Sequence, residues 1–224
     1  MDDRIGRITV GQAPRVDMTD DIRSRLAPGL ELVEYGALDD MTLEDVEREL
    51  KPLPGEEVLV SRMRDGRQAT FSGTRVVPLV QQRIDEAEAA GADAIILLCT
   101  GGFPQLRHRV PLIVPQPLFY SVAHALAGGR TIAVMVPDAA QVEQAHVWWG
   151  KAGLTIKTVQ ASPYGDLDAI ARAARSLRDS GCAFLCLDCM GFSTKMREIA
   201  RRESGLDVLL PRTLVASTVS ELLG

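Results

Sequence analysis

Two cysteines occupy the same place in two similar segments of this sequence, and their repetition suggests paired thiol chemistry. In each segment an apolar run typical of a buried strand leads to a cysteine, and glycine and phenylalanine follow it. The segments are residues 93–103, with Cys99, and residues 182–193, with Cys189. In open parallel sheets, ligands bind outside the carboxyl ends of the strands. The sequence therefore predicts a site built on Cys99 and Cys189.

A thiol suits acid–base chemistry because its pKa, roughly 8.5 when free, falls toward neutrality near a helix N-terminus. A thiolate that removes an α-proton from one face of a carbon, with a thiol that protonates the other face, would invert a stereocentre. Backbone N–H groups after each cysteine would also hold a substrate carboxylate or an enolate oxygen, since glycine permits close approach. The candidate binding residues in these two turns are Thr100, Gly101, Gly102, Gly191, Phe192 and Ser193.

The competing interpretation is that these cysteines are ordinary core residues. Cysteine is often fully buried, and a single cysteine at a strand end is more often packing than catalytic. The repeated context favours catalysis for Cys99 and Cys189. Cys182 and Cys186 share one strand face by the two-residue period, so we interpret them as packing residues. The same period turns Cys189 to the opposite face, and no histidine lies nearby, which argues against a metal site.

The loop after the first expected strand carries further candidates for substrate binding. Gln12 and Arg15 leave that strand, residues 4–10, at the same sheet edge as the cysteines. Gln12 would orient a substrate, and Arg15 would pair with a carboxylate through two hydrogen bonds. The alternative is a plain strand-to-helix turn with a surface arginine. Arg75, at the start of a later helix, is another candidate partner for a carboxylate.

The sequence gives no support for a nucleotide cofactor. Its glycines form neither a Gly-x-Gly-x-x-Gly pattern after the first strand nor a Walker loop. The three histidines have no evident serine or aspartate partner for triad chemistry. We therefore expect a site that works without a cofactor or a metal.

Composition limits the classes of protein to consider. The chain has 224 residues, of which 46% are hydrophobic and 25% charged, as is ordinary for a globular protein with a sizeable core. A net charge of −5 gives no basic surface for nucleic acid. We expect no signal peptide and no membrane span, hence a cytoplasmic protein with four free thiols.

Strand-like and helix-like segments alternate along most of the chain, which predicts parallel sheets with right-handed crossovers. Two short strands around Asp65-Gly66 predict a hairpin at the edge of such a sheet. We predict two similar Rossmann-like α/β lobes, because each half has its own cysteine-tipped strand, with a boundary near residues 115–117. The expected strands are 4–10, 31–35, 58–63, 68–71, 93–99, 111–115, 131–136, 154–159, 182–189 and 207–210; the expected helices are 17–26, 39–50, 76–90, 117–126, 138–150, 166–180, a segment ending at 203, and 211–223.

Two stretches resemble the AroM protein family: residues 9–17, Thr-Val-Gly-Gln-Ala-Pro-Arg-Val-Asp, and residues 187–192, Leu-Asp-Cys-Met-Gly-Phe. More broadly, the chain is similar to the aspartate/glutamate racemase superfamily, whose members have two α/β lobes and need no cofactor. The resemblance implies that Cys99 and Cys189 are the cysteines of the two lobes, with the active site in the cleft between them. It also implies that the last helix returns to the first lobe. The lobes would then be residues 1–115 plus 208–224, and residues 116–207.

The sequence departs from amino-acid racemases at both cysteines. Cys99 is followed by Thr-Gly-Gly where those enzymes usually have Asn-Thr, and Cys189 by Met-Gly where they have Thr-His. Their Asp-Ser after the first strand is replaced here by Gln12 and the residues up to Arg15. These differences leave the substrate open.

The leading hypothesis is a cofactor-independent racemase or epimerase of a small carboxylate or carbonyl compound. The first alternative keeps the fold and uses one cysteine in a lyase, decarboxylase or cis–trans isomerase. The second is a small-molecule binding or regulatory protein without activity, since fold does not settle function. The expected partner is a small molecule bearing a carboxylate, and a homodimer is compatible with the sequence.

Overall fold

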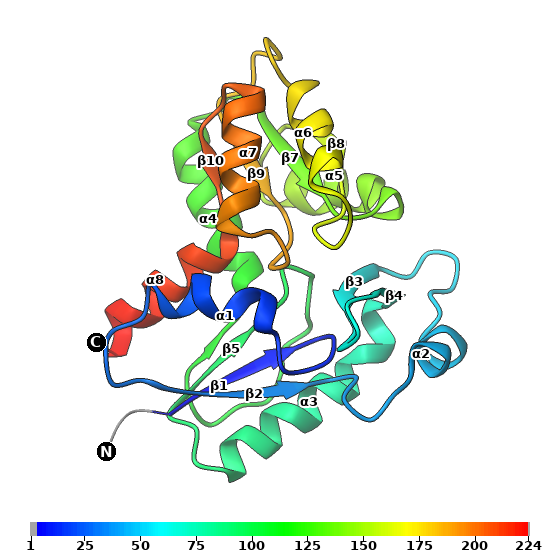
Figure 1. Ribbon diagram of the computed structural model, residues 1–224, viewed down its shortest axis with the longest axis vertical. Helices are drawn as coiled ribbons and strands as arrows, with labels where there is room; N and C mark the ends of the chain where they lie inside the picture. Colours follow the sequence, from blue (N-terminus) through cyan, green and yellow to red (C-terminus); the bar gives the residue numbers. More distant parts are fainter. Residues whose placement is uncertain (1–3, 224) are drawn as a thin grey trace. The chain divides into compact units, whose positions relative to one another are not determined.

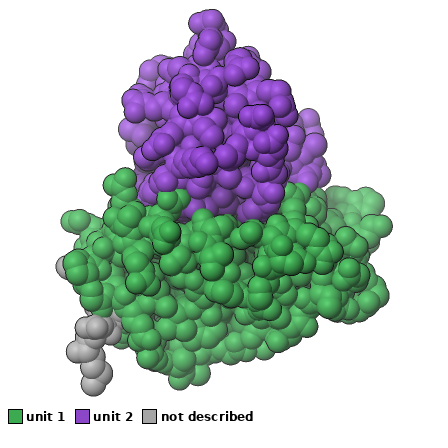
Figure 2. Space-filling model, in the orientation of Figure 1, with its two compact units in different colours: residues 1–116, 215–224 green, residues 117–214 purple. Residues whose placement is uncertain are grey.

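The computed structural model describes residues 4–223, which form two compact units (Figures 1 and 2). Unit 1 extends to Gln116 and resumes at Val215, and unit 2 is Pro117–Leu214. The sequence placed the corresponding changes after residues 115 and 207. Each unit is an α/β structure around a parallel sheet, as predicted.

The sheet of unit 1 has four parallel strands in the order β2-β1-β5-β6. Strand β1 (Arg4–Thr9) lies inside the sheet, with β2 (Glu31–Gly36) on one side and β5 (Ala94–Leu97) on the other. Strand β6 (Leu112–Ile113) completes the edge beside β5. All four residues of β5 are buried, in agreement with the continuous apolar run that predicted an interior strand.

Helices α1 (Val16–Arg23) and α3 (Gly73–Ala89) lie on opposite sides of this sheet (Figure 1). The predicted apolar stripe of α3 is confirmed, since Val76, Val80, Ile84 and Ala87 are completely buried. Helix α2 (Leu43–Glu49) is shorter than predicted because it starts at a capping box formed by Thr42 and Asp45.

The predicted hairpin is present as strands β3 (Val58–Arg62) and β4 (Gln68–Ser72), paired antiparallel. It forms a two-stranded sheet of its own and does not extend the parallel sheet, contrary to the prediction. A single backbone bond, from the Gln12 N–H to the Arg62 carbonyl at 3.2 Å, joins it to the loop after β1. Strand β4 runs directly into α3, so the hairpin is fixed beside the carboxyl end of β1.

The sheet of unit 2 repeats the arrangement of unit 1. Its parallel strands lie in the order β10-β9-β7-β8, where β7 is Ile132–Val136, β8 is Ile156–Gln160, β9 is Leu185–Leu187 and β10 is Val208–Leu209. In both units the first strand is interior, the second forms one edge, and the third is the strand that leads to the cysteine. The prediction of two similar lobes is therefore confirmed.

Helices cover both faces of the second sheet. One face packs against α6 (Leu167–Arg175) and α7 (Thr194–Ser204), and the other against α4 (Pro115–Ala127) and α5 (Val142–Lys151). A short 3₁₀ helix, Ala139–Gln141, precedes α5 and accounts for the earlier helix start predicted at residue 138. Trp149 of α5 is completely buried, as expected for an aromatic residue packed on a sheet.

The chain passes between the units inside two helices of equal length. Helix α4 (Pro115–Ala127) and helix α8 (Pro211–Leu223) each follow the fourth strand of a unit and begin with proline. Proline suits the first helical position because its missing N–H has no intrahelical partner there. From Val215 onward, α8 belongs to unit 1.

Candidate functional site

Cys99 lies two residues beyond the end of β5, which is an interior strand of the unit 1 sheet. Its side chain is buried, with 8% of the residue exposed. The Gly101 N–H donates a hydrogen bond to Cys99 Sγ at 3.3 Å, so the backbone turns back onto the sulfur. A donor at this distance favours the thiolate over the thiol, because a hydrogen bond to the charged form stabilises it.

The turn after Cys99 is covered by the hairpin of unit 1. A Cβ atom at Gly101 would collide with Leu59 Cδ2 of β3, the end of a flexible side chain. A Cβ at Gly102 would lie 3.5 Å from Glu57 Oε2 and 3.7 Å from the Gln116 amide, which places polar side chains on that side of the turn. The segment from residue 98 to 111 contains no helix, so the backbone donor to Cys99 comes from the turn itself and not from a helix N-terminus.

Gln12 and Arg64 form part of the loop structure at the end of β1. The Gln12 amide nitrogen donates to the Leu38 and Met41 carbonyls at 3.0 and 2.9 Å, and its oxygen accepts from the Arg64 N–H at 2.7 Å. These bonds connect three loops of unit 1 through one buried side chain. The amide predicted to orient a substrate therefore also supports the loop.

Arg15 is almost fully buried and binds a carboxylate of its own chain. Its Nε and Nη2 atoms donate to the two oxygens of Asp17 at 2.9 and 2.8 Å, and Nη1 donates to Thr9 and Ser61 at 3.1 and 3.3 Å. The predicted two-bond geometry is present, with Asp17 as the carboxylate. Arg15 also occupies the N-cap position of α1, without a side-chain cap hydrogen bond.

Arg75 lies in the first turn of α3 and extends toward the end of α2. Its guanidinium donates to the Glu49 carbonyl at 3.3 Å and lies 3.7 Å from the Glu56 carboxylate. Its backbone N–H binds Ser72 Oγ, the cap of α3. The structure thus places the Arg75 side chain against α2.

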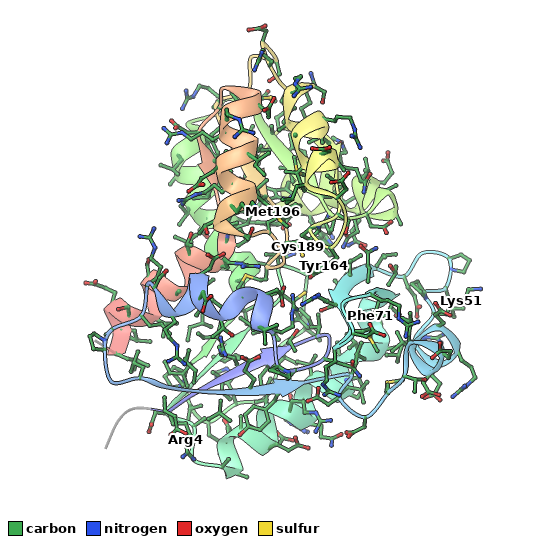
Figure 3. All side chains as sticks on the ribbon, viewed as in Figure 1. Arg4, Lys51, Phe71, Tyr164, Cys189 and Met196 are labelled. Atoms are coloured by element: carbon green, nitrogen blue, oxygen red, sulfur yellow. The ribbon has the colours of Figure 1, made fainter. Side chains whose placement is uncertain are left out.

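Cys189 lies two residues beyond β9 and repeats the geometry of Cys99. It too is 8% exposed, and its Sγ accepts from the Gly191 N–H at 3.3 Å. A second polar group lies beside it: Tyr164 Oη is 4.0 Å from Sγ, at the long limit for a hydrogen bond to sulfur (Figure 3). Nothing in the sequence pattern indicated Tyr164, which comes from the loop between β8 and α6.

The predicted binding residues after Cys189 connect it to α7. Gly191 is in contact with Tyr164 and Pro163, Phe192 is completely buried in the core, and Ser193 Oγ accepts the Met196 N–H at 3.2 Å as the cap of α7. The Phe192 N–H donates to the Cys189 carbonyl at 3.2 Å. The side chains of Phe192 and Ser193 therefore fix the turn and the helix that follows it.

A buried arginine also holds this turn. Arg212 is fully buried, and its Nε and Nη2 atoms donate to the Met190 carbonyl at 2.9 and 2.7 Å. It places a positive charge at the carbonyl of the residue that follows Cys189. The one signal in the sequence is an arginine directly after the proline that starts an apolar helix.

Asp188 turns away from Cys189 toward two aromatic side chains. Asp188 Oδ2 accepts from Trp149 Nε1 at 2.7 Å and from Tyr120 Oη at 3.4 Å. The Tyr120 and Trp149 rings lie 4.0 Å apart between centroids. This buried carboxylate anchors the end of β9 to α4 and α5.

The remaining two cysteines serve packing. Burial raises the pKa of the Cys186 thiol well above its usual range, and the nearby charge of Asp188 raises it further. Cys182 packs in the same core cluster as Cys189, whereas Cys186 packs in the cluster on the other face. The prediction that Cys182 and Cys186 share a face is wrong because β9 begins only at Leu185, after Gly181 with φ +75°.

Within residues 4–223, no group of three or more histidine, cysteine or acidic side chains is arranged to hold a metal ion. Over the same range, no helix combines the length and the apolar character needed to cross a membrane.

Comparison with known proteins gives one family and a set of related folds. The family model described as AroM protein matches residues 5–223. Among solved structures, the Picrophilus torridus aspartate racemase has a TM-score of 0.66 at 13% identity, covering 99% of this chain and 94% of its own. The maleate isomerase Iso from Pseudomonas putida S16 has a TM-score of 0.65 at 13% identity, with coverages of 98% and 92%.

A third fold of this kind is arylmalonate decarboxylase, with a TM-score of 0.62 at 16% identity and coverages of 99% and 92%. Among curated proteins, no sequence matches this chain. At such identities the structural likeness establishes the fold, which is that of aspartate/glutamate racemase-type proteins.

Proposed function

Since this chain belongs to the AroM family and has the fold of the aspartate/glutamate racemase-type proteins, we propose that it is a cofactor-independent racemase or epimerase. Its substrate is a small carboxylate or carbonyl compound with an acidic C–H bond. The observation that carries the proposal is the repeated turn. In each lobe the sulfur of a cysteine accepts a hydrogen bond from the N–H of the glycine two residues later.

The proposed reaction exchanges one proton at each face of a carbon. The thiolate of one cysteine takes the α-proton, the electron pair of the C–H bond moves into an enolate, and the thiol of the other cysteine protonates the opposite face. The two sulfur atoms end with their protonation states exchanged, and turnover in the reverse direction restores them. The proposal requires Cys99 and Cys189 to reach the same substrate carbon.

The glycine amides have a different task from the one expected from the sequence. The N–H groups of Gly101 and Gly191 bind the sulfur atoms, so they stabilise a thiolate and are engaged before any substrate arrives. We assign stabilisation of the enolate oxygen to other groups of the same turns, beginning with the Thr100 hydroxyl and the Gly102 N–H at Cys99. Thr100 follows Cys99 directly and Gly102 lies three residues after it, and both carry hydrogen-bond donors.

The second candidate is a lyase, decarboxylase or cis–trans isomerase that uses one cysteine. Two of the proteins with this fold are named as an arylmalonate decarboxylase and a maleate isomerase. The different neighbours of the two turns favour keeping this candidate, since Leu59 contacts one and Tyr164 the other. The third candidate is a binding protein in which neither thiol reacts.

The test is solvent deuterium incorporation into a panel of small acids, amino acids and hydantoins. We expect deuterium at the stereocentre with the wild-type protein, and a loss of at least ~100-fold in both Cys99→Ser and Cys189→Ser, as for removal of a general acid or base. Cys182→Ser, which changes a packing cysteine of the same lobe as Cys189, is the matched control and should retain activity.

The outcomes separate the three candidates. Loss of activity in only one of the two cysteine variants would replace the racemase with the one-cysteine enzyme. No deuterium in any compound, together with ligand binding that survives alkylation of both thiols, would leave the binding protein.

A further inference from the structure

The position of Tyr164 is determined by its own loop. Between β8 and α6 the chain makes a tight turn in which the Tyr164 N–H donates to Ser162 Oγ at 3.1 Å and the Gly165 N–H to the Ser162 carbonyl at 3.3 Å. Pro163, which precedes Tyr164, is buried. The phenol therefore projects from a braced turn toward the end of β9.

The turn after Cys189 is shaped to receive this phenol. A Cβ atom at Gly191 would lie 2.5 Å from Tyr164 Oη, 2.7 Å from Cζ and 2.8 Å from Pro163 Cγ, all too close for a real side chain. Gly191 has no positive φ, so glycine is needed here for the close approach and not for the backbone conformation. The hydroxyl is thus seated against the peptide that also donates its N–H to Cys189 Sγ.

The other lobe has an apolar group in the corresponding place. Over Gly101, the atom that fills the space of a Cβ is the Leu59 methyl Cδ2. A methyl group donates no hydrogen bond, whereas a phenol does. The two cysteines therefore share a backbone donor and differ in the side chain packed on the glycine.

We propose that Tyr164 is a positioning residue that stabilises the thiolate of Cys189 in the resting protein. The Tyr164 hydroxyl donates to Cys189 Sγ while that sulfur is charged, and Tyr164 keeps its own proton throughout. This assignment rests on the proposed two-cysteine chemistry and adds a direction to it. Cys189 takes the first proton from the substrate, and Cys99 delivers one.

Replacing Tyr164 with Phe removes the hydroxyl and leaves the charged groups around Cys189 in place. Among the described residues, Asp188 lies on the side of Tyr120 and Trp149, and its charge opposes a thiolate. Arg212 lies at the Met190 carbonyl, and its charge favours one. A variant that removes only the hydroxyl therefore isolates the contribution of Tyr164.

The test measures the pH midpoint of alkylation at each cysteine, without any substrate. Iodoacetamide is applied to a Cys182→Ala/Cys186→Ala background, so that Cys99 and Cys189 can be followed in separate tryptic peptides by mass spectrometry. Rates normalised to their plateau at high pH report ionisation and not access to the buried sulfur, because the thiolate is the reacting form.

Tyr164→Phe should raise the Cys189 midpoint by about one pH unit, or slow its alkylation at pH 7 roughly tenfold, as for loss of a hydrogen bond to a charged group. The Cys99 midpoint should not move. Tyr120→Phe, which removes a phenol hydroxyl bound to Asp188 in the same lobe, is the matched control and should leave the Cys189 midpoint in place.

A Cys189 midpoint unchanged by Tyr164→Phe would overturn the proposal. Its failure is distinguishable from failure of the proposed reaction. Deuterium incorporation that needs both cysteines, with no effect of Tyr164 on the midpoint, would retain the racemase and remove the assigned direction. A shifted midpoint without deuterium incorporation would retain Tyr164 as the residue that stabilises the Cys189 thiolate and remove the racemase.

Discussion

The two cysteine turns are built on the same backbone plan and differ in what surrounds them. In both, the sulfur lies two residues past an interior strand and accepts the N–H of the glycine two residues on, at 3.3 Å. After Cys99 the chain continues without a helix to residue 111, and a methyl group of Leu59 packs on Gly101 in the turn. After Cys189 it enters α7 within five residues. The phenol of Tyr164 packs on this turn, and the buried Arg212 donates to its Met190 carbonyl.

This difference separates what the fold supplies from what this sequence adds. The shared part, a thiol at a strand end with a backbone donor, follows from the repeated strand and glycine. The distinct part comes from elements outside the turn: a hairpin in unit 1, and the β8–α6 loop and the start of α8 in unit 2. We infer that the neighbours, and not the turns, give the two thiols different chemical roles.

The largest effect on stability is expected from the two buried arginines. Replacing Arg212 with Met leaves the Met190 carbonyl without its charged donor, and replacing Arg15 with Met leaves the Asp17 carboxylate without its two-bond partner. Each should lower the free energy of unfolding by about 3 kcal/mol, measured by urea denaturation. Only Arg212→Met should also raise the plateau rate of Cys189 alkylation, because it frees that turn.

The contrast between the two turns would be wrong if Arg15→Met raised the plateau rate of Cys189 alkylation as much as Arg212→Met does. The two arginines would then not act on separate turns. If Arg212→Met changed neither stability nor alkylation, its bonds to Met190 would have no part in holding the turn.

A smaller effect is expected from adding one methyl group to each turn. Gly191→Ala forces a Cβ against the rigid rings of Tyr164 and Pro163, whereas Gly101→Ala meets the end of the flexible Leu59 side chain. Overpacking of this kind costs about 1–3 kcal/mol, and we expect Gly191→Ala near the upper end and Gly101→Ala near the lower. Thermal unfolding of the two variants checks the order.

The paired rescue sharpens this test. Leu59→Ala should restore stability in the Gly101→Ala background, since it removes the colliding methyl, while leaving Gly191→Ala as unstable as before. An equal loss of stability in Gly101→Ala and Gly191→Ala would mean that Leu59 and Tyr164 move aside equally easily. The inference that Tyr164 is held rigidly against Gly191 would then be wrong.

Much of the scaffold could be predicted because it depends on local patterns. The apolar runs before Cys99 and Cys189 predicted interior strands, and the stripe from Val76 to Ala87 predicted the buried face of α3. The site is harder to predict because its contacts join distant residues. Tyr164 and Cys189 are 25 positions apart, and Arg15 and Ser61 are 46 apart. No periodicity links such pairs, so Tyr164, Arg212 and the contact of Arg15 with Ser61 emerged only from the structure.

The smallest predicted effect concerns Cys186, the thiol of β9 that serves packing. Its pKa in the folded protein is raised by burial and by Asp188, so the folded state holds this proton more tightly than the unfolded state. The resulting contribution to stability is complete below the unfolded pKa of about 8.5 and is lost as the pH rises toward the folded value. Above pH 8.5, this group alone should lower the free energy of unfolding by about 1.4 kcal/mol per pH unit.

Urea unfolding at pH 7 and pH 9.5, under reducing conditions, measures this slope. Cys186→Ala should be less stable than wild type at pH 7 because it leaves a cavity, but it should lose less stability on going to pH 9.5. Val134→Ala makes a cavity directly beside Cys186 in the sheet and should keep the wild-type slope. A slope in Cys186→Ala equal to that of wild type would mean that this thiol ionises as readily in the folded protein as in the unfolded chain. The contrast between a packing thiol and the two thiols held by glycine amides would then fail.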